Sequence, residues 1–217
     1  MFSPEFDPEP DCSICPRLRE FILHHRSANP DWHNAPVDTW VASAGEKTVR
    51  LLITGLAPGL QGANRTGRPF TGDYAGDLLY STLLKFGFAG GEYDKTPDDG
   101  LFLKNCAITN AVRCVPPENK PVGAEINNCR PFLMRTIERF PNLAAIVTLG
   151  KISHDSVVRA LGGKISQIPF GHNNAQDVGG YRIFSSYHCS RYNTNTGRLT
   201  ESMFEDVFSA ANEYCLK

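Results

Sequence analysis

Residues 49–54 of the chain read VRLLIT, and the next five residues, 55–59, read GLAPG. The first segment has the short, mostly apolar pattern of a strand buried on both faces, and the second is typical of the glycine- and proline-rich loop that ends such a strand. Similar apolar runs recur at 105–112 (NCAITNAV), 143–149 (LAAIVTL) and 181–187 (YRIFSSY). The sequence therefore predicts four strands.

Segments with apolar residues at helical spacing lie between and around these runs. They predict a first helix from Pro16, a last helix from Thr200, and helices over 76–86, 123–140 and 151–161. Strands that alternate with helices predict an α/β fold of three layers, in which helices flank a short, mainly parallel central sheet. Ligands of such sheets bind at the carboxyl ends of the strands. We therefore expect the site in the loops that follow residues 54, 112, 149 and 187.

Length and composition predict a single domain over residues 1–217. Apolar residues make up 41% of the 217, which is enough for one core, and no run of about 18 apolar residues could span a membrane. The first residues, MFSPE, lack the basic and then apolar pattern of a secretory signal, so we expect a cytoplasmic protein. In that setting the seven cysteines favour metal binding or chemistry over disulfides.

Positive charge is concentrated in two stretches, although the formal net charge is only −1. Residues 47–72 contain no acid but include Arg68, and residues 178–200 contain no acid but include Arg191 and Arg198. If the fold brings the two stretches together, a near-neutral protein gains a positive face. On charge alone, ordinary scatter of charged residues in loops explains the pattern better.

The loop from Gly55 to Asp73 (GLAPGLQGANRTGRPFTGD) follows a predicted strand and precedes a predicted helix. It matches neither the P-loop nor the dinucleotide fingerprint. A loop of this kind can bring backbone N–H groups close to a carbonyl or a phosphate of a ligand. Phe70 is either a core residue or a platform for a planar ring, and Asp73 either caps the next helix or acts as a general base. The residues alone favour the structural role of each.

Four of the cysteines form two groups. Cys12 and Cys15 make a CxxC pair, Cys114 follows the second predicted strand, and Cys129 lies on the helix after it. Four thiolates in this arrangement could hold zinc or an iron–sulfur cluster, and their spacing does not choose between the two. The alternative is that Cys114 and Cys129 are core residues, as we expect for the three remaining cysteines, Cys106, Cys189 and Cys215.

The fourth predicted strand ends in a polar and basic segment, YHCSRYNTNTGR, over residues 187–198. A histidine that leaves a strand here, His188, is by itself more often a plain surface residue. Together with Arg191 and the small polar side chains around it, it would also suit contacts with a phosphate backbone.

These three segments together resemble a known family. The loop 55–73, the segment 108–121 (ITNAVRCVPPENKP) with its upstream CxxC, and the segment 185–200 (SSYHCSRYNTNTGRLT) are similar to the uracil-DNA glycosylase superfamily. The forms GANRTGRPFTGD and SRxNTxTGRLT most resemble family 5, the b-type enzymes. The resemblance covers essentially the whole chain in order. It implies an α/β/α fold with a short parallel sheet, in agreement with the pattern of strands and helices.

The resemblance also implies a structural [4Fe–4S] cluster that ties residues 1–30 to the body of the protein, held by Cys12, Cys15, Cys114 and Cys129. It implies that Phe70 stacks on an extruded base and that the backbone of Gly55, Leu56 and Ala57 lines the uracil pocket. Three residues take catalytic roles by the same resemblance: Asp73 as the acidic residue, Asn119 as an accessory position and His188 near uracil O2. Arg191 and its neighbours, with Arg68 and Arg198, are expected at the DNA.

Three positions depart from the family pattern. Leu56 stands where family 4 has an acid, so the catalytic carboxylate must come from elsewhere. Asn110 matches the uracil-reading asparagine of family 4, which some family-5 members lack, and its amide could bond uracil O4 and N3–H. Cys189 stands where many members have proline, which would make the start of the following loop less rigid.

The predicted reaction is hydrolytic removal of uracil from single- or double-stranded DNA, with other deaminated bases as candidate substrates, and it leaves an abasic site. The expected enzyme is a monomer of prokaryotic type that is associated with the nucleoid. No lysine occupies a nucleophile position in the three motifs, so we expect no lyase activity. One alternative is a DNA- or uracil-binding module without catalysis, which the presence of both Asp73 and His188 disfavours. Another is a nucleotide hydrolase with a zinc site, which the lack of a phosphate-chain or magnesium motif disfavours.

Overall fold

The computed structural model describes residues 5–216. At its centre lies a sheet of six strands in the order β1-β5-β2-β6-β8-β7. The inner four strands, β5, β2, β6 and β8, are parallel to one another. In sheet order the strands are β1 (Trp40–Val41), β5 (Cys106–Asn110), β2 (Leu51–Gly55), β6 (Ala145–Leu149), β8 (Tyr181–Ser186) and β7 (Asn174–Val178). The predicted α/β fold with a mainly parallel sheet is confirmed.

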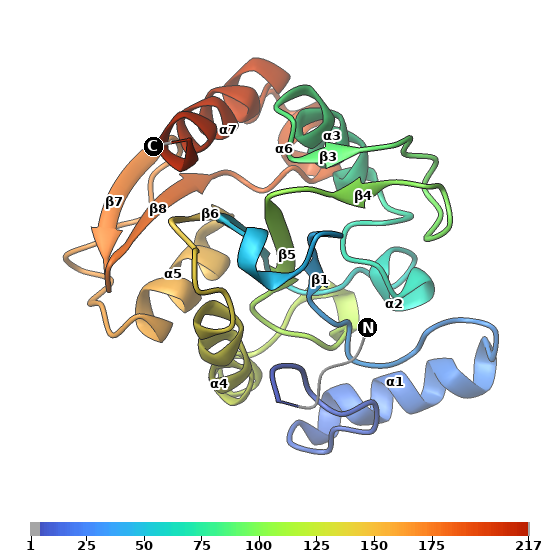
Figure 1. Ribbon diagram of the computed structural model, residues 1–217. Helices are drawn as coiled ribbons and strands as arrows, with labels where there is room; N and C mark the ends of the chain where they lie inside the picture. The colour runs from blue at the N-terminus through green and yellow to red at the C-terminus, as the bar shows by residue number, and fades with distance from the viewer. Residues whose placement is uncertain (1–4, 217) are drawn as a thin grey trace.

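Helices cover both faces of this sheet (Figure 1). Successive side chains of a strand point to opposite faces: in β2, Leu51 and Ile53 pack in one core cluster and Leu52 packs in another. The first cluster is completed by α3 (Tyr74–Lys85) and α7 (Glu201–Cys215), and the second by α4 (Gly123–Glu138) and α5 (Lys151–Ala160). Because both faces are covered, the inner strands β2, β5 and β6 are buried along their whole length rather than at alternate residues.

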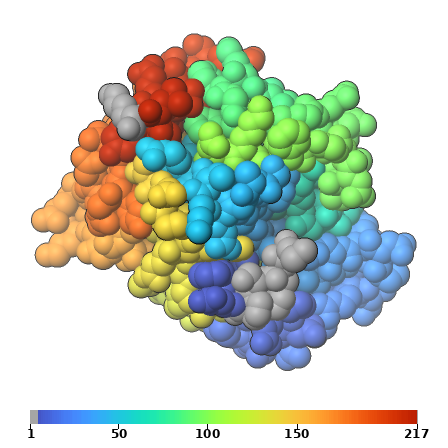
Figure 2. Space-filling model, viewed as in Figure 1, coloured from blue at the N-terminus to red at the C-terminus, as the bar shows by residue number. Residues whose placement is uncertain are grey.

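The N-terminal helix α1 (Pro16–Ala28) lies beside these layers rather than on the sheet (Figure 1), and the blue N-terminal segment packs against the body in Figure 2. Leu18 and Ile22 of α1 belong to a third apolar cluster, which also contains Cys114 and Cys129. Two long-range ion pairs hold the same segment, Arg17 to Glu125 and Asp7 to Arg113, each at 2.7 Å. The prediction of one domain over 1–217 includes residues 1–4 and 217, which lie outside the described residues.

The elements that the sequence did not predict are short or polar. The outer strands β1 and β7 pair antiparallel with their neighbours, and β7 is mostly exposed and polar. Between α3 and β5, β3 (Ala89–Gly90) pairs with β4 (Phe102–Leu103), and we call residues 91–101 between these two strands the excursion. Short helices α2 (Ala63–Thr66) and α6 (Arg191–Asn195) lie within two of the predicted loops. Among the described residues, no helix is long and apolar enough to cross a membrane.

Candidate functional site

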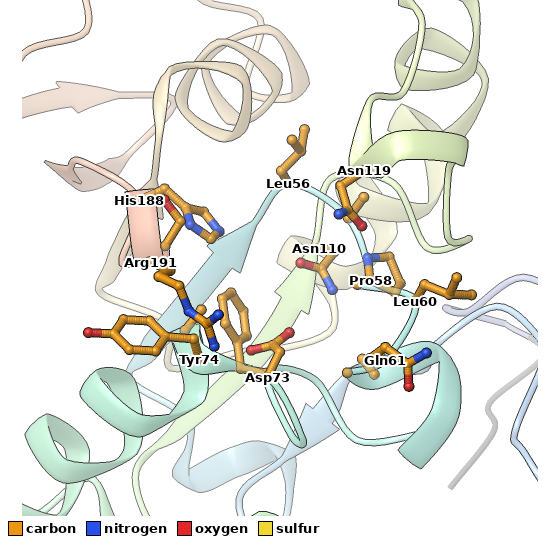
Figure 3. Close-up of a pocket in the computed structure, with 17 residues that line it drawn as sticks. Leu56, Pro58, Leu60, Gln61, Asp73, Tyr74, Asn110, Asn119, His188 and Arg191 are labelled. Atoms are coloured by element: carbon orange, nitrogen blue, oxygen red, sulfur yellow. The ribbon is translucent and has the colours of Figure 1, made fainter. Parts of the chain in front are cut away.

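A cavity of about 470 Å³ opens where strands β2, β5 and β8 end. Figure 3 shows His188, Arg191 and Tyr74 on one side of it, Asn110 and Asn119 on the other, and Asp73 between the two sides. It is the edge of the sheet at which parallel strands place ligands. The loop 55–73 supplies most of the wall, which includes Leu56, Ala57, Pro58, Gly59, Leu60, Gln61, Gly62, Ala63, Phe70 and Asp73.

Gly55 ends β2 where two functional side chains meet. Gly55 pairs with Asn110 of β5 in the sheet register. A Cβ atom at position 55 would collide with Asn110 Oδ1 and would come within 2.6 Å of the Phe70 ring. The absence of a side chain at Gly55 therefore leaves the space in which an amide and an aromatic ring face the cavity together.

Asn110 is 3% exposed, and its Oδ1 atom has no hydrogen-bond partner among the described residues. A buried acceptor without a partner is costly unless a ligand supplies the donor.

Phe70 projects into the cavity from an uncommon backbone conformation, with φ +53°. A left-handed conformation is rare for an aromatic residue and marks a position that its surroundings hold in place. The Phe70 and His188 rings are stacked, with centroids 6.0 Å apart and planes inclined by 28°. The ring therefore offers one wall to the cavity and contacts a second predicted site residue.

Asp73 is both a helix cap and a wall of the cavity. Its Oδ1 atom accepts a hydrogen bond from the Gly76 N–H at 3.3 Å, as the N-cap of α3. Its Oδ2 atom lies over the turn from Gly59 to Gly62, where a Cβ at Gly62 would collide with it. Burial raises the pKa of the Asp73 carboxyl above its ordinary value, although backbone hydrogen bonds act in the opposite direction. The two alternatives considered from the sequence, a cap and a group facing a ligand, are thus compatible in one side chain.

His188 lies directly after β8 and faces the same cavity. Burial lowers the pKa of its imidazole to about 4, because no charged partner offsets the loss of solvent. The ring is therefore neutral at physiological pH and can donate one hydrogen bond without carrying charge. The side chain of Asn193 donates to the His188 carbonyl at 2.8 Å, which fixes the backbone at this position.

The mouth of the cavity is formed by Arg191 and by a residue that the sequence did not single out, Tyr74. The Arg191 guanidinium lies 5.3 Å from the centre of the Tyr74 ring, and the Thr194 hydroxyl donates to the Tyr74 hydroxyl at 3.2 Å. These contacts tie α6 to the start of α3, beside Asp73. Position alone, directly after Asp73, is the signal that could have pointed to Tyr74.

The remaining predicted residues fall in two places. Leu56, Ala57 and the exposed Asn119 line the cavity, as do Leu60 and Gln61, which the sequence did not single out. Arg198 lines an adjacent cavity of about 300 Å³ that shares Leu56 and His188 with the first, and its guanidinium lies 4.5 Å from the Tyr187 ring centre.

Arg68 corrects one of the predictions. Its side chain is only 7% exposed, and its guanidinium forms two hydrogen bonds with the Asp99 carboxylate, at 2.8 and 2.7 Å. A guanidinium that is buried and already paired is not available to a DNA phosphate. We therefore remove Arg68 from the residues expected to contact DNA. Its partner lies 31 positions away in the chain, and no sequence pattern indicates this pairing.

The four cysteines Cys12, Cys15, Cys114 and Cys129 are free thiols; Cys114 and Cys129 belong to the third apolar cluster, and Cys15 packs against it. Burial, and the proximity of the other three thiols, raise the pKa of the Cys114 thiol. The Cys129 sulfur accepts the backbone N–H of Arg113 at 3.4 Å, and the Cys15 sulfur accepts the Asn128 side-chain amide at 3.6 Å. Over residues 5–216, no three cysteine, histidine or acidic side chains are close enough to hold a single metal ion. The other three cysteines, Cys106, Cys189 and Cys215, are buried, as expected.

The family model of the uracil DNA glycosylase superfamily matches residues 42–212. The type-5 uracil-DNA glycosylase of Thermus thermophilus is 38% identical over 92% of this chain and 92% of its own length. That of Pyrobaculum aerophilum is 34% identical over 95% and 91%. A type-4 uracil-DNA glycosylase of Sulfurisphaera tokodaii is 31% identical over 77% and 72%. The match spans the loop 55–73, β5 and the segment after β8, which together build the cavity, and this chain belongs to the uracil DNA glycosylase superfamily.

Proposed function

We propose that the 470 Å³ cavity is where this uracil-DNA glycosylase holds a uracil base extruded from DNA and hydrolyses its N-glycosyl bond. An enzyme of this kind must first take the nucleotide out of the base stack, at a cost of a few kcal/mol. Stacking of the extruded base on the Phe70 ring would return part of that free energy, since base–aromatic stacking contributes roughly 1–3 kcal/mol. The cavity reaches this ring from the open mouth at Arg191.

The observation that carries the proposal is the unpartnered Oδ1 atom of Asn110 beside the Phe70 ring. Uracil presents an N–H donor at N3 and a carbonyl acceptor at O4 on neighbouring atoms. The Asn110 amide offers the complementary acceptor and donor. Cytosine presents the opposite pattern at these two positions, so a fixed amide would favour uracil over cytosine.

Cleavage of the bond leaves positive charge on the sugar and negative charge on the base. We assign the developing charge at uracil O2 to the neutral His188 ring and to backbone N–H groups of residues 55–57, which act as preorganised donors. We assign to Asp73 the orientation of the attacking water or the stabilisation of the sugar cation. Its raised pKa suits a base that takes up a proton at moderate pH. Asn119, at the edge of the cavity, is the accessory polar group.

The reaction stops at the abasic site. A lyase step needs an amine nucleophile that forms a Schiff base with the sugar. No lysine is among the described residues that line the cavity. We therefore propose a monofunctional glycosylase. We also propose that it acts on DNA as a monomer, as the family resemblance implies.

Cys12, Cys15, Cys114 and Cys129 are proposed to hold a [4Fe–4S] cluster. The thiol of Cys114 lies near those of Cys12, Cys15 and Cys129, and four cysteine thiolates are the usual ligands of such a cluster. Hydrogen bonds from Arg113 N–H and Asn128 to cysteine sulfurs are of the kind that tune such clusters. The cluster would serve to fasten residues 5–28 to the loop after β5 and to α4, away from the cavity.

The experiment that tests the assignment measures base release from single- and double-stranded oligonucleotides that carry uracil, hypoxanthine or a thymine mismatch. Wild-type protein should release uracil, and Asn110→Ala should lower the rate on uracil far more than it lowers affinity for duplex DNA with an abasic site. Equal losses in the two quantities would show that Asn110 supports the structure rather than reads the base.

A further inference from the structure

The backbone at Phe70 is held by the hydroxyls of two tyrosines, Tyr80 and Tyr93, that do not themselves line the cavity. Tyr80 of α3 donates a hydrogen bond to the Pro69 carbonyl, and Tyr93 donates to the Phe70 carbonyl at 3.4 Å. The two tyrosine rings contact each other, with centroids 4.5 Å apart. The Phe70 carbonyl and the Tyr93 hydroxyl also pack so closely on α3 that a Cβ at Gly76 would collide with both. The left-handed conformation of Phe70 is therefore fixed from several directions.

The buried Arg68–Asp99 pair packs against the rings of the two tyrosines. The Arg68 guanidinium lies 4.9 Å from the Trp40 ring centre, 5.7 Å from that of Tyr80 and 5.9 Å from that of Tyr93. Its Nε atom donates to the Thr71 hydroxyl at 2.7 Å, so the pair also holds the residue after Phe70.

Asp99 is anchored in turn by its own backbone contacts. Its carboxylate accepts the N–H groups of Asp94 and Leu101, each at 3.0 Å. With Arg68, these hydrogen bonds lower the pKa of the Asp99 carboxyl to about 2. The carboxylate is thus ionised and fully hydrogen-bonded, and it fixes Arg68 in one position.

We infer that Tyr80, Tyr93 and the Arg68–Asp99 pair form a clamp that positions the Phe70 ring for the extruded base. Neither tyrosine, Arg68 nor Asp99 lines the cavity, so all four are positioning residues rather than catalytic ones. Tyr93 and Asp99 belong to the excursion between β3 and β4, which therefore contributes to excision without touching the substrate. The inference rests on the proposed role of Phe70 as the stacking platform.

The test removes single hydroxyls. Both variants keep the aromatic ring. Tyr80→Phe removes the hydrogen bond to the Pro69 carbonyl, and Tyr93→Phe removes the hydrogen bond to the Phe70 carbonyl. Each should lower the single-turnover rate on uracil-containing duplex by about tenfold, the equivalent of one net hydrogen bond. Affinity for duplex with an abasic site should stay within about twofold of wild type. Tyr214→Phe, on the far α7 side of the core, is the matched control and should keep the wild-type rate.

A double-mutant cycle separates positioning from general stability. If the tyrosines act through Phe70, adding Tyr93→Phe to Phe70→Leu should cause no further loss of rate, whereas melting temperatures should change additively. A further tenfold loss in the double variant, or wild-type rates in both tyrosine variants, would overturn the clamp. Asp99→Asn provides a second route if Tyr80→Phe does not fold. A wild-type rate for Phe70→Leu itself would instead overturn the platform role in the proposed function.

Discussion

Asp73 uses its two carboxylate oxygens for different contacts, one for the N-terminus of α3 and one for the cavity. Because its pKa is raised, the folded protein binds a proton at this site more tightly than the unfolded chain does. The contribution of Asp73 to stability therefore falls as pH rises above its ordinary pKa of 3.8. At neutral pH the ionised Asp73 side chain lowers the free energy of unfolding, which is the kind of loss that functional residues often cause.

The substitution Asp73→Asn should change stability and catalytic rate in opposite directions. Asparagine caps helices as well as aspartate does, and it carries no charge to desolvate. At pH 7 we expect the melting temperature to stay level or rise, while the single-turnover rate on uracil falls by about two orders of magnitude or more. Thermal melting and rapid-quench assays on the same preparation measure both. A variant that cleaves at the wild-type rate would leave Asp73 with the capping role alone.

His188 should contribute only while the base is leaving. His188→Ala is expected to lower the single-turnover rate on uracil by roughly two to three orders of magnitude, the scale of one lost oxyanion donor. Affinity for abasic duplex should change much less, because no base is present there. Since the His188 pKa is about 4, the wild-type rate should also show no inflection near pH 6.5. His24→Ala, on the exposed face of α1, is the control. Equal losses of rate and affinity would make His188 a support for the loop after β8.

At the scale of elements, the five-residue helix α6 places the guanidinium of Arg191 over the ring of Tyr74 at the cavity mouth. Arg191→Ala should weaken duplex binding and reduce the slope of log affinity against log salt concentration by about 0.9, the value for one phosphate contact. Titrations at four or more salt concentrations give this slope. Arg159→Ala, at the far end of α5, should leave it unchanged. An unchanged slope for Arg191→Ala would place this guanidinium away from the phosphates.

Elements also show what a sequence pattern can reveal. The four inner strands were predicted because each is a run of five or six mostly buried residues. β1, β3 and β4 have two residues each, too few for any periodicity, and β7 is polar because it lies at an edge. The cavity could be expected at the strand ends, and long motifs identified most of its wall. The partner of Arg68 could not be predicted, because the pairing depends on how the excursion 91–101 folds back.

At the scale of the whole molecule, the N-terminal segment is held by the Arg17–Glu125 and Asp7–Arg113 ion pairs and by the third apolar cluster. If the four cysteines hold a cluster, Cys114→Ala should lose the brown charge-transfer absorbance and the bound iron. Its melting temperature should fall by about 2–4 °C for each kcal/mol lost. Cys215→Ala, at the end of α7, should keep the iron and the colour. A Cys114→Ala protein with unchanged iron content and melting temperature would refute the assignment of this ligand.

The long-range attachment of the N-terminal segment sets the order of events during synthesis. Asp7 and Arg17 find their partners 106 and 108 positions later in the chain. At about 5–20 residues per second, a ribosome needs roughly 5–20 s to make that stretch. During this interval α1 has no surface to bury its apolar side, and the thiols of Cys12 and Cys15 stay open to solvent. The segment that carries Asp7 and Arg17 can therefore dock only after residues 113–125 have been made.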